Sequence, residues 1–126
     1  FDQTLLNKNK DKISLFEGMD IRDFNMGPSY DLLVCDLSFI SIRNVVESFY
    51  RLLKVGGIGV VLVKPQFEVG KGNTKKGIVR ELELREQALA DVVSELEKHN
   101  FKILGTCDSP IQGGDGNHEY FVCIQK

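Results

Sequence analysis

One stretch constrains the fold more than any other: the apolar run from Val60 to Val63, which ends abruptly at Lys64 and Pro65. Four consecutive apolar residues with no alternating polar position are typical of a central strand in a parallel sheet that is covered on both faces. In open α/β sheets, ligands bind beyond the carboxyl ends of the strands. Lys64 follows this strand directly and is therefore the first candidate for a functional residue.

A second buried strand is predicted over residues 31–35, and it also ends on a charged residue, Asp36. Between the two strands, apolar residues recur at helical spacing over residues 41–54, and Ser41 can cap the start of this helix. A strand, a helix and a strand form a crossover that is almost always right-handed, so both strands end at the same edge of the sheet. We expect Asp36 and Lys64 to project into one cleft.

The other predicted elements are two helices and three strands. Residues 1–12 are expected to form a solvated helix or turn, 13–16 a short strand, 81–99 a helix and 101–107 a third strand. The closing strand, residues 118–124, follows without an intervening helix and must run antiparallel to its partner. The sequence therefore predicts an α/β fold with a doubly wound, mostly parallel sheet and an antiparallel hairpin strand at its C-terminal end.

Length and composition fit one globular domain. The chain has 126 residues, of which 42% are hydrophobic and 27% charged. The sequence has no apolar run that approaches the ~20 residues of a membrane span and no export leader, so we expect a cytoplasmic protein that does not enter membranes. No strand with a glycine-rich cofactor loop precedes Ile13, so the chain is expected to be the later part of a larger domain.

The cysteines and the net charge further restrict the classes of function that the sequence allows. Cys35, Cys107 and Cys123 lie in apolar runs without CxxC spacing, which predicts small buried side chains rather than bridges or metal ligands. The net charge of −2 argues against binding nucleic acid through bulk charge. A glycine-rich loop over residues 68–79 nevertheless has a local cluster of basic residues at its end: Lys71, Lys75, Lys76 and Arg80. This loop is either a solvated turn or a contact for phosphate.

Four sequence motifs stand out: CDLSFIS at 35–41, LVKPQFEVG at 62–70, KGIVR at 76–80, and SP at 109–110 leading to GNHEYF at 116–121. Taken together, these motifs resemble the TlyA, or haemolysin A, family of FtsJ-like ribose methyltransferases. The resemblance covers roughly residues 13–125. It implies a Rossmann-like class I methyltransferase that uses S-adenosyl-L-methionine and acts on the ribose 2′-hydroxyl of ribosomal RNA, in the free RNA or in ribosomal subunits. It also implies an S4-type RNA-binding domain upstream.

The resemblance assigns roles to individual residues. FtsJ-like enzymes carry a Lys-Asp-Lys-Glu tetrad, in which Asp36, Lys64 and Glu119 match the last three members. The first lysine belongs beside the glycine-rich loop, in sequence that this chain lacks. Asp20 and Ile21 are similar to the loop that meets the cofactor's adenine, while Asp36 and Glu119 would balance charge near the cationic cofactor.

Several alternatives stay open. Lys64 could act as a base toward the hydroxyl or as a charge that stabilises the developing alkoxide. Considered without the resemblance, Asp36 could merely help to start a helix, and Glu119 could be an exposed carboxylate. A pore-forming haemolysin and a noncatalytic RNA-binding or ribosome-binding module are the competing functions.

Overall fold

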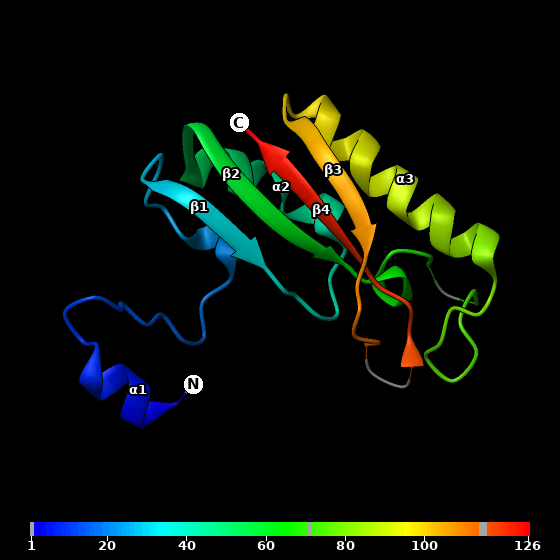
Figure 1. The fold of residues 1–126 in the computed structure, drawn as a ribbon, viewed down its shortest axis with the longest axis horizontal. Helices are drawn as coiled ribbons and strands as arrows, with labels where there is room; N and C mark the ends of the chain where they lie inside the picture. The colour runs from blue at the N-terminus through cyan, green and yellow to red at the C-terminus, as the bar shows by residue number, and fades with distance from the viewer. Residues whose placement is uncertain (1, 71, 114–115) are drawn as a thin grey trace.

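The fold is a four-stranded sheet with its two longer helices packed on one face (Figure 1). The computed structural model describes residues 2–70, 72–113 and 116–126. The strands lie in the order β1-β2-β4-β3. Their bounds are β1 Tyr30–Cys35, β2 Leu53–Val63, β3 Lys102–Asp108 and β4 Tyr120–Gln125.

The sheet is mixed, so the prediction of a mostly parallel sheet needs correction. β1 pairs with β2 in parallel, as the crossover argument requires, with Cys35 opposite Val61. β4 lies between β2 and β3 and is antiparallel to both, which leaves one parallel pairing out of three. The reason is that the terminal hairpin places its second strand inside the sheet rather than at its edge. The predicted antiparallel direction of the closing strand is confirmed.

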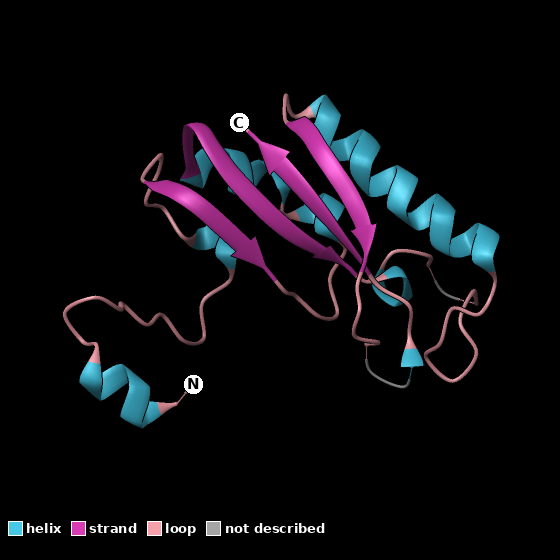
Figure 2. Cartoon of the chain, viewed as in Figure 1, coloured by secondary structure: helices cyan, strands magenta, loops and turns pink. Residues whose placement is uncertain are grey.

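Helices α2 (Val46–Leu52) and α3 (Leu82–Lys98) cover one face of the sheet (Figure 2). Their buried residues, among them Phe49 and Val92, form a single core with alternate residues of the strands. The prediction that both faces are covered is wrong, because Leu32 and Val34 on the opposite face are 61% and 74% exposed. An apolar run indicates a strand but neither its place in the sheet nor what lies on each of its faces.

The N-terminal segment differs most from expectation. Residues 13–16 form no strand, because β1 is an edge of the sheet and no neighbour pairs with them. Phe16 instead makes an edge-to-face contact with Phe24 at 4.9 Å between ring centroids. Helix α1 (Gln3–Lys8), which Asp2 caps, has no buried residue, in agreement with the predicted solvated helix.

Helix α3 follows its sequence signals closely. It ends where Asn100 adopts a positive φ of 67°, a conformation that asparagine tolerates after a helix. Among the described helices, none is long and apolar enough to cross a membrane.

The cysteines are only partly as predicted. All three are free thiols, and Cys35 is buried at the end of β1, where burial raises its pKa to about 12. Cys107 is exposed and Cys123 is half-buried, since both lie on the uncovered face of the sheet beside Phe121. The prediction of a buried side chain is therefore wrong for Cys107.

Candidate active site

The parallel pair β1 and β2 delivers an acid and an amine to the same edge of the sheet. Asp36 and Lys64 each follow the last residue of their strand, and Lys64 Nζ lies 2.5 Å from Asp36 Oδ1. Lys64 Nζ also donates to Ser38 Oγ at 3.1 Å. The Lys64 side chain is only 14% exposed, whereas that of Asp36 is 69% exposed. The ammonium is thus held by two short-range contacts, with its carboxylate partner open to a ligand.

Glu119 reaches the same edge from the opposite direction. β4 is antiparallel to β2, so the residue just before β4 lies beside the end of β2. Glu119 is 5% exposed, and its Oε2 accepts from Gln66 Nε2 at 2.8 Å. The Gln66 Oε1 atom is buried without a hydrogen-bond partner among the described residues. Unsatisfied buried polar atoms are rare in folded proteins.

The three predicted residues line one cavity of about 520 Å³. Asp36, Lys64 and Glu119 share its wall with Ser38, Phe39 and Gln66, and with loop residues that include Gly77 and Gly113. This volume falls within the range of small-molecule sites. The cavity combines two carboxylates and one ammonium with an aromatic rim, so it can position a polar group and move a proton.

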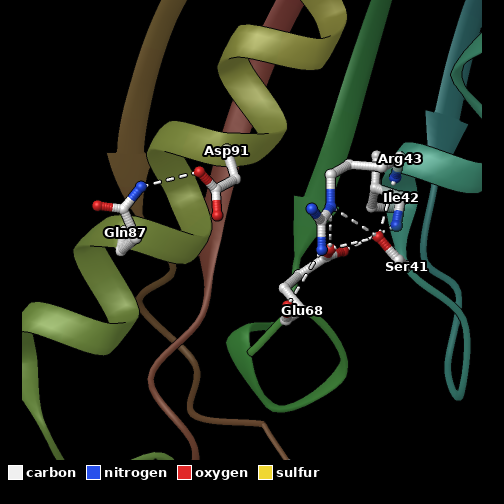
Figure 3. Close-up of polar contacts among 6 residues, drawn as sticks. All are labelled: Ser41, Ile42, Arg43, Glu68, Gln87 and Asp91. Carbon is white, nitrogen blue, oxygen red and sulfur yellow. Dashed lines mark hydrogen bonds and ion pairs between the residues drawn. The ribbon is translucent and has the colours of Figure 1, made fainter. Parts of the chain in front are cut away.

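A buried carboxylate braces the two loops that carry Asp36 and Lys64 (Figure 3). Glu68 follows the short 3₁₀ helix η3 (Pro65–Phe67) and accepts from Ser41 Oγ at 2.5 Å and from the Ile42 N–H at 2.7 Å. Ile42 begins the 3₁₀ helix η2 (Ile42–Asn44), and Arg43 of this helix forms an ion pair with Glu68 at 3.5 Å. Burial raises the pKa of the Glu68 carboxyl, and the hydrogen bonds from Ser41 and Ile42 oppose that rise.

Replacing Glu68 by glutamine should lower the free energy of unfolding by about 1–3 kcal/mol, because the new amide turns a donor toward groups that already donate. Urea denaturation of the full-length protein measures this loss. Asp91→Asn is the matched control, since Asp91 accepts from Gln87 at 2.8 Å on the exposed surface of α3 (Figure 3). An equal loss in both variants would show that the brace adds no stability of its own.

Asp20 and Ile21 line a separate cavity of about 290 Å³, with Phe16, Met19, Phe24 and Leu37. Asp20 caps the 3₁₀ helix η1 (Ile21–Asp23). Its carboxylate pairs with Arg22 at 2.7 Å, and the hydrogen bonds from Arg22 lower the pKa of Asp20 to about 2. The structure does not bring these two residues into the Lys64 cavity. Leu37 of this second cavity lies in the chain between Asp36 and Ser38, which both line the Lys64 cavity.

The basic segment, residues 72–80, lies beside the Lys64 cavity. Lys75 pairs with Ile78 through two main-chain hydrogen bonds of 2.9 and 3.0 Å, and the tight turn between them has positive φ at Lys76 and Gly77. Lys75, Lys76 and Arg80 are exposed. Lys71, the fourth basic residue predicted for this loop, lies outside the described residues.

Sequence reasoning missed several residues of the site. Phe39 is 89% exposed at the cavity rim, adopts a positive φ of 62°, and contacts Phe67 at 5.0 Å between ring centroids. A non-glycine residue in this conformation is uncommon and often marks a functional position. Its place within the CDLSFIS motif was the only available signal. Gln66 and Glu68 also lie within a quoted motif, but their contacts depend on loops that periodicity does not describe.

Comparison with known proteins identifies close relatives. A protein named 23S rRNA (cytidine-2′-O)-methyltransferase TlyA from Campylobacter jejuni is 35% identical over 121 residues, which cover 94% of this chain and 47% of the relative. Hemolysin A of Brachyspira hyodysenteriae is 34% identical over 120 residues, covering 91% of this chain and 50% of the relative. The chain spans about half the length of the curated relatives it matches.

Solved structures agree on the fold. A Lactococcus lactis protein described as a hemolysin superposes with a TM-score of 0.77 at 31% identity, covering 90% of this chain and 54% of that one. An S-adenosylmethionine-dependent methyltransferase from Methanosarcina mazei has a TM-score of 0.56 at 16% identity, with 86% and 65% coverage, and shares the fold alone. The model of the FtsJ-like methyltransferase family matches residues 2–126, and the chain belongs to that family.

Proposed function

We propose that this chain carries the reacting groups of an S-adenosyl-L-methionine-dependent methyltransferase whose substrate is a ribose 2′-hydroxyl of ribosomal RNA. The observation that carries the proposal is the clamped ammonium of Lys64, 2.5 Å from Asp36 in the cavity that also holds Glu119. Relatives from Campylobacter jejuni and Mycobacterium tuberculosis bear the name rRNA (cytidine-2′-O)-methyltransferase TlyA. This activity would place the protein in the cytoplasm with the ribosomes.

The cavity residues have distinct roles in this proposal. Bound S-adenosyl-L-methionine supplies an electrophilic methyl group. Lys64 meets the ribose hydroxyl and either, as a neutral amine, takes its proton or, as an ammonium, stabilises the charge that develops on the oxygen. Asp36 fixes the direction of the ammonium, and Glu119 orients the hydroxyl from the far wall. Holding both reactants in line supplies much of the rate in such a transfer.

The adenine of the cofactor fits the second cavity. Its walls are mostly apolar and include the contacting rings of Phe16 and Phe24, and the ionised Asp20 carboxylate provides an acceptor for an exocyclic amine. Ile21 would pack against the ring. Because Asp36 and Leu37 are consecutive residues that line the two cavities, a ligand that enters both would pass the end of β1. The glycine-rich loop expected upstream would hold the remainder of the cofactor.

Two features favour RNA as the acceptor. Phe39 offers an exposed ring on which an unstacked base can lie, a common mode of single-strand recognition. Lys75, Lys76 and Arg80 provide cations for the phosphates beside it.

Reversing the charges of Lys75 and Lys76 should weaken RNA binding and flatten its dependence on salt, by about 0.7 in slope for each lost single-strand phosphate contact. Binding of labelled RNA at several salt concentrations measures the slope. The double variant Lys54→Glu with Lys102→Glu is the matched control. These two lysines lie near the starts of β2 and β3, at the opposite end of the strands from Lys64. A slope that the Lys75 and Lys76 changes leave unaltered would exclude them from the RNA contact.

Mapping ribose methylation on ribosomes tests the whole proposal. Ribosomes from cells that lack the gene should miss a 2′-O-methyl group, and the wild-type gene should restore it while a Lys64→Ala gene should not. Identical maps with and without the gene would refute the proposal. Calorimetry with S-adenosyl-L-methionine distinguishes the proposed enzyme, which should bind the cofactor, from a noncatalytic ribosome-binding module. Lysis of red cells by the pure protein would instead indicate a haemolysin.

A further inference from the structure

The buried side chain of Asn117 joins the basic segment to the residues that lead into β4, which include Glu119. Asn117 is 3% exposed, its Oδ1 accepts from the Val79 N–H at 3.0 Å, and its Nδ2 donates to the Gly77 carbonyl at 2.8 Å. Gly77 lies within the turn that presents Lys75 and Lys76, and Val79 directly follows that turn. One amide therefore fixes the C-terminal side of that turn through an acceptor and a donor at once.

The main chain of the same residue holds another part of the cavity wall. The Asn117 carbonyl accepts from the Gly113 N–H at 2.8 Å. Gly113 in turn lies against the Glu119 carboxylate so closely that a Cβ atom there would be 1.8 Å from Oε2. Gly77 and Gly113 both line the Lys64 cavity, and Asn117 lies two residues before Glu119. Asn117 thus sets the spacing between the basic turn and the buried carboxylate.

We propose that Asn117 is a positioning residue that couples phosphate contacts at the basic segment to the placement of Glu119 against the ribose. This inference rests on the proposed function and adds the link between RNA capture and reaction geometry. The turn is rigid enough to transmit position, because its ends are tied by two main-chain bonds and its C-terminal side by the Asn117 amide. An RNA backbone held by Lys75 and Lys76 would then present its hydroxyl at a fixed distance from Glu119.

The kinetic test compares Asn117→Ala with Asn73→Ala in the full-length protein, with ribosomal subunits from cells that lack the gene as substrate. Asn73 is the matched control, because its amide makes a single bond to the Val69 carbonyl at 2.7 Å in the same segment. We expect Asn117→Ala to lower kcat by about 10- to 100-fold, the cost of a misplacement near 1 Å. RNA affinity should stay near that of the wild type, because every lysine remains. Loss of affinity with an unchanged kcat, or equal effects in both variants, would overturn the coupling.

A second measurement does not depend on activity. We would titrate a mixed-sequence single-stranded RNA of about 12 nucleotides, within the usual site size, into the isotopically labelled protein and follow backbone amide shifts. In the wild type, amides of residues 75–79 and of Gly113 and Glu119 should shift together; in Asn117→Ala only the first group should. Shifts of both groups in the variant, or none at Gly113 and Glu119 in the wild type, would overturn the inference. If the wild-type protein transferred no methyl group, that result would instead refute the proposed function.

Discussion

Lys64→Ala should abolish most methyl transfer, by about 10²- to 10⁴-fold, the range expected when a group that handles a proton is removed. Affinity for S-adenosyl-L-methionine should hardly change, because the cavity proposed for the adenine lies around Asp20 and Ile21 and shares no described residue with the Lys64 cavity. Single-turnover methyl transfer and calorimetry on the full-length protein measure the two quantities separately. Equal losses in rate and cofactor affinity would exclude the proposed role.

Two further variants separate the effect of losing the Lys64 charge from the effect of losing the packing of its side chain. Lys64→Met keeps the aliphatic stem that is largely buried beside Ser38, so its rate should be as low as that of Lys64→Ala. Lys54→Ala removes another lysine of β2, paired with Asp31 of β1 at 3.5 Å at the opposite edge of the sheet. Its pair is exposed and worth little, so both rate and affinity should match the wild type.

The Lys64 and Asp36 pair was predictable because it depends on local rules. Each strand reads as an apolar run that stops at a charged residue, and the handedness of a parallel crossover places both ends together. No such rule places Glu119. Its position depends on β4 entering the sheet between β2 and β3, a pairing of residues far apart in the sequence, and only the GNHEYF motif pointed to it.

The errors have a common physical origin in tertiary pairing. The run at residues 13–16 has the composition of a strand, but a strand forms only where a neighbour satisfies its backbone. The apolar residues of β1 and β2 indicated burial, yet Val34 lies on the face without helices. The positive φ of Phe39 could not be predicted from the sequence either, because phenylalanine gives no local signal for that conformation.

Gly113→Ala should reduce methyl transfer by about 100-fold, the cost of displacing a reacting group by roughly 1 Å. The new Cβ would lie 1.8 Å from Glu119 Oε2 and 2.3 Å from its Cδ, so one of the two must move. The carboxylate ends a flexible side chain and can turn away from the cavity. We therefore expect the loss to fall on kcat, with the thermal midpoint much less affected.

Gly105→Ala is the matched control, because the added Cβ at this strand position meets no atom within 4 Å. Its rate should equal that of the wild type, and its alanine should not weaken β3. The double variant Gly113→Ala with Glu119→Gln decides whether the effect passes through the carboxylate. If it does, the double variant should be no slower than Glu119→Gln alone, because a displaced carboxylate and a missing one cost the same rate. Additive losses would mean that Gly113 acts on the cavity by another route and that Glu119 is not the group it positions.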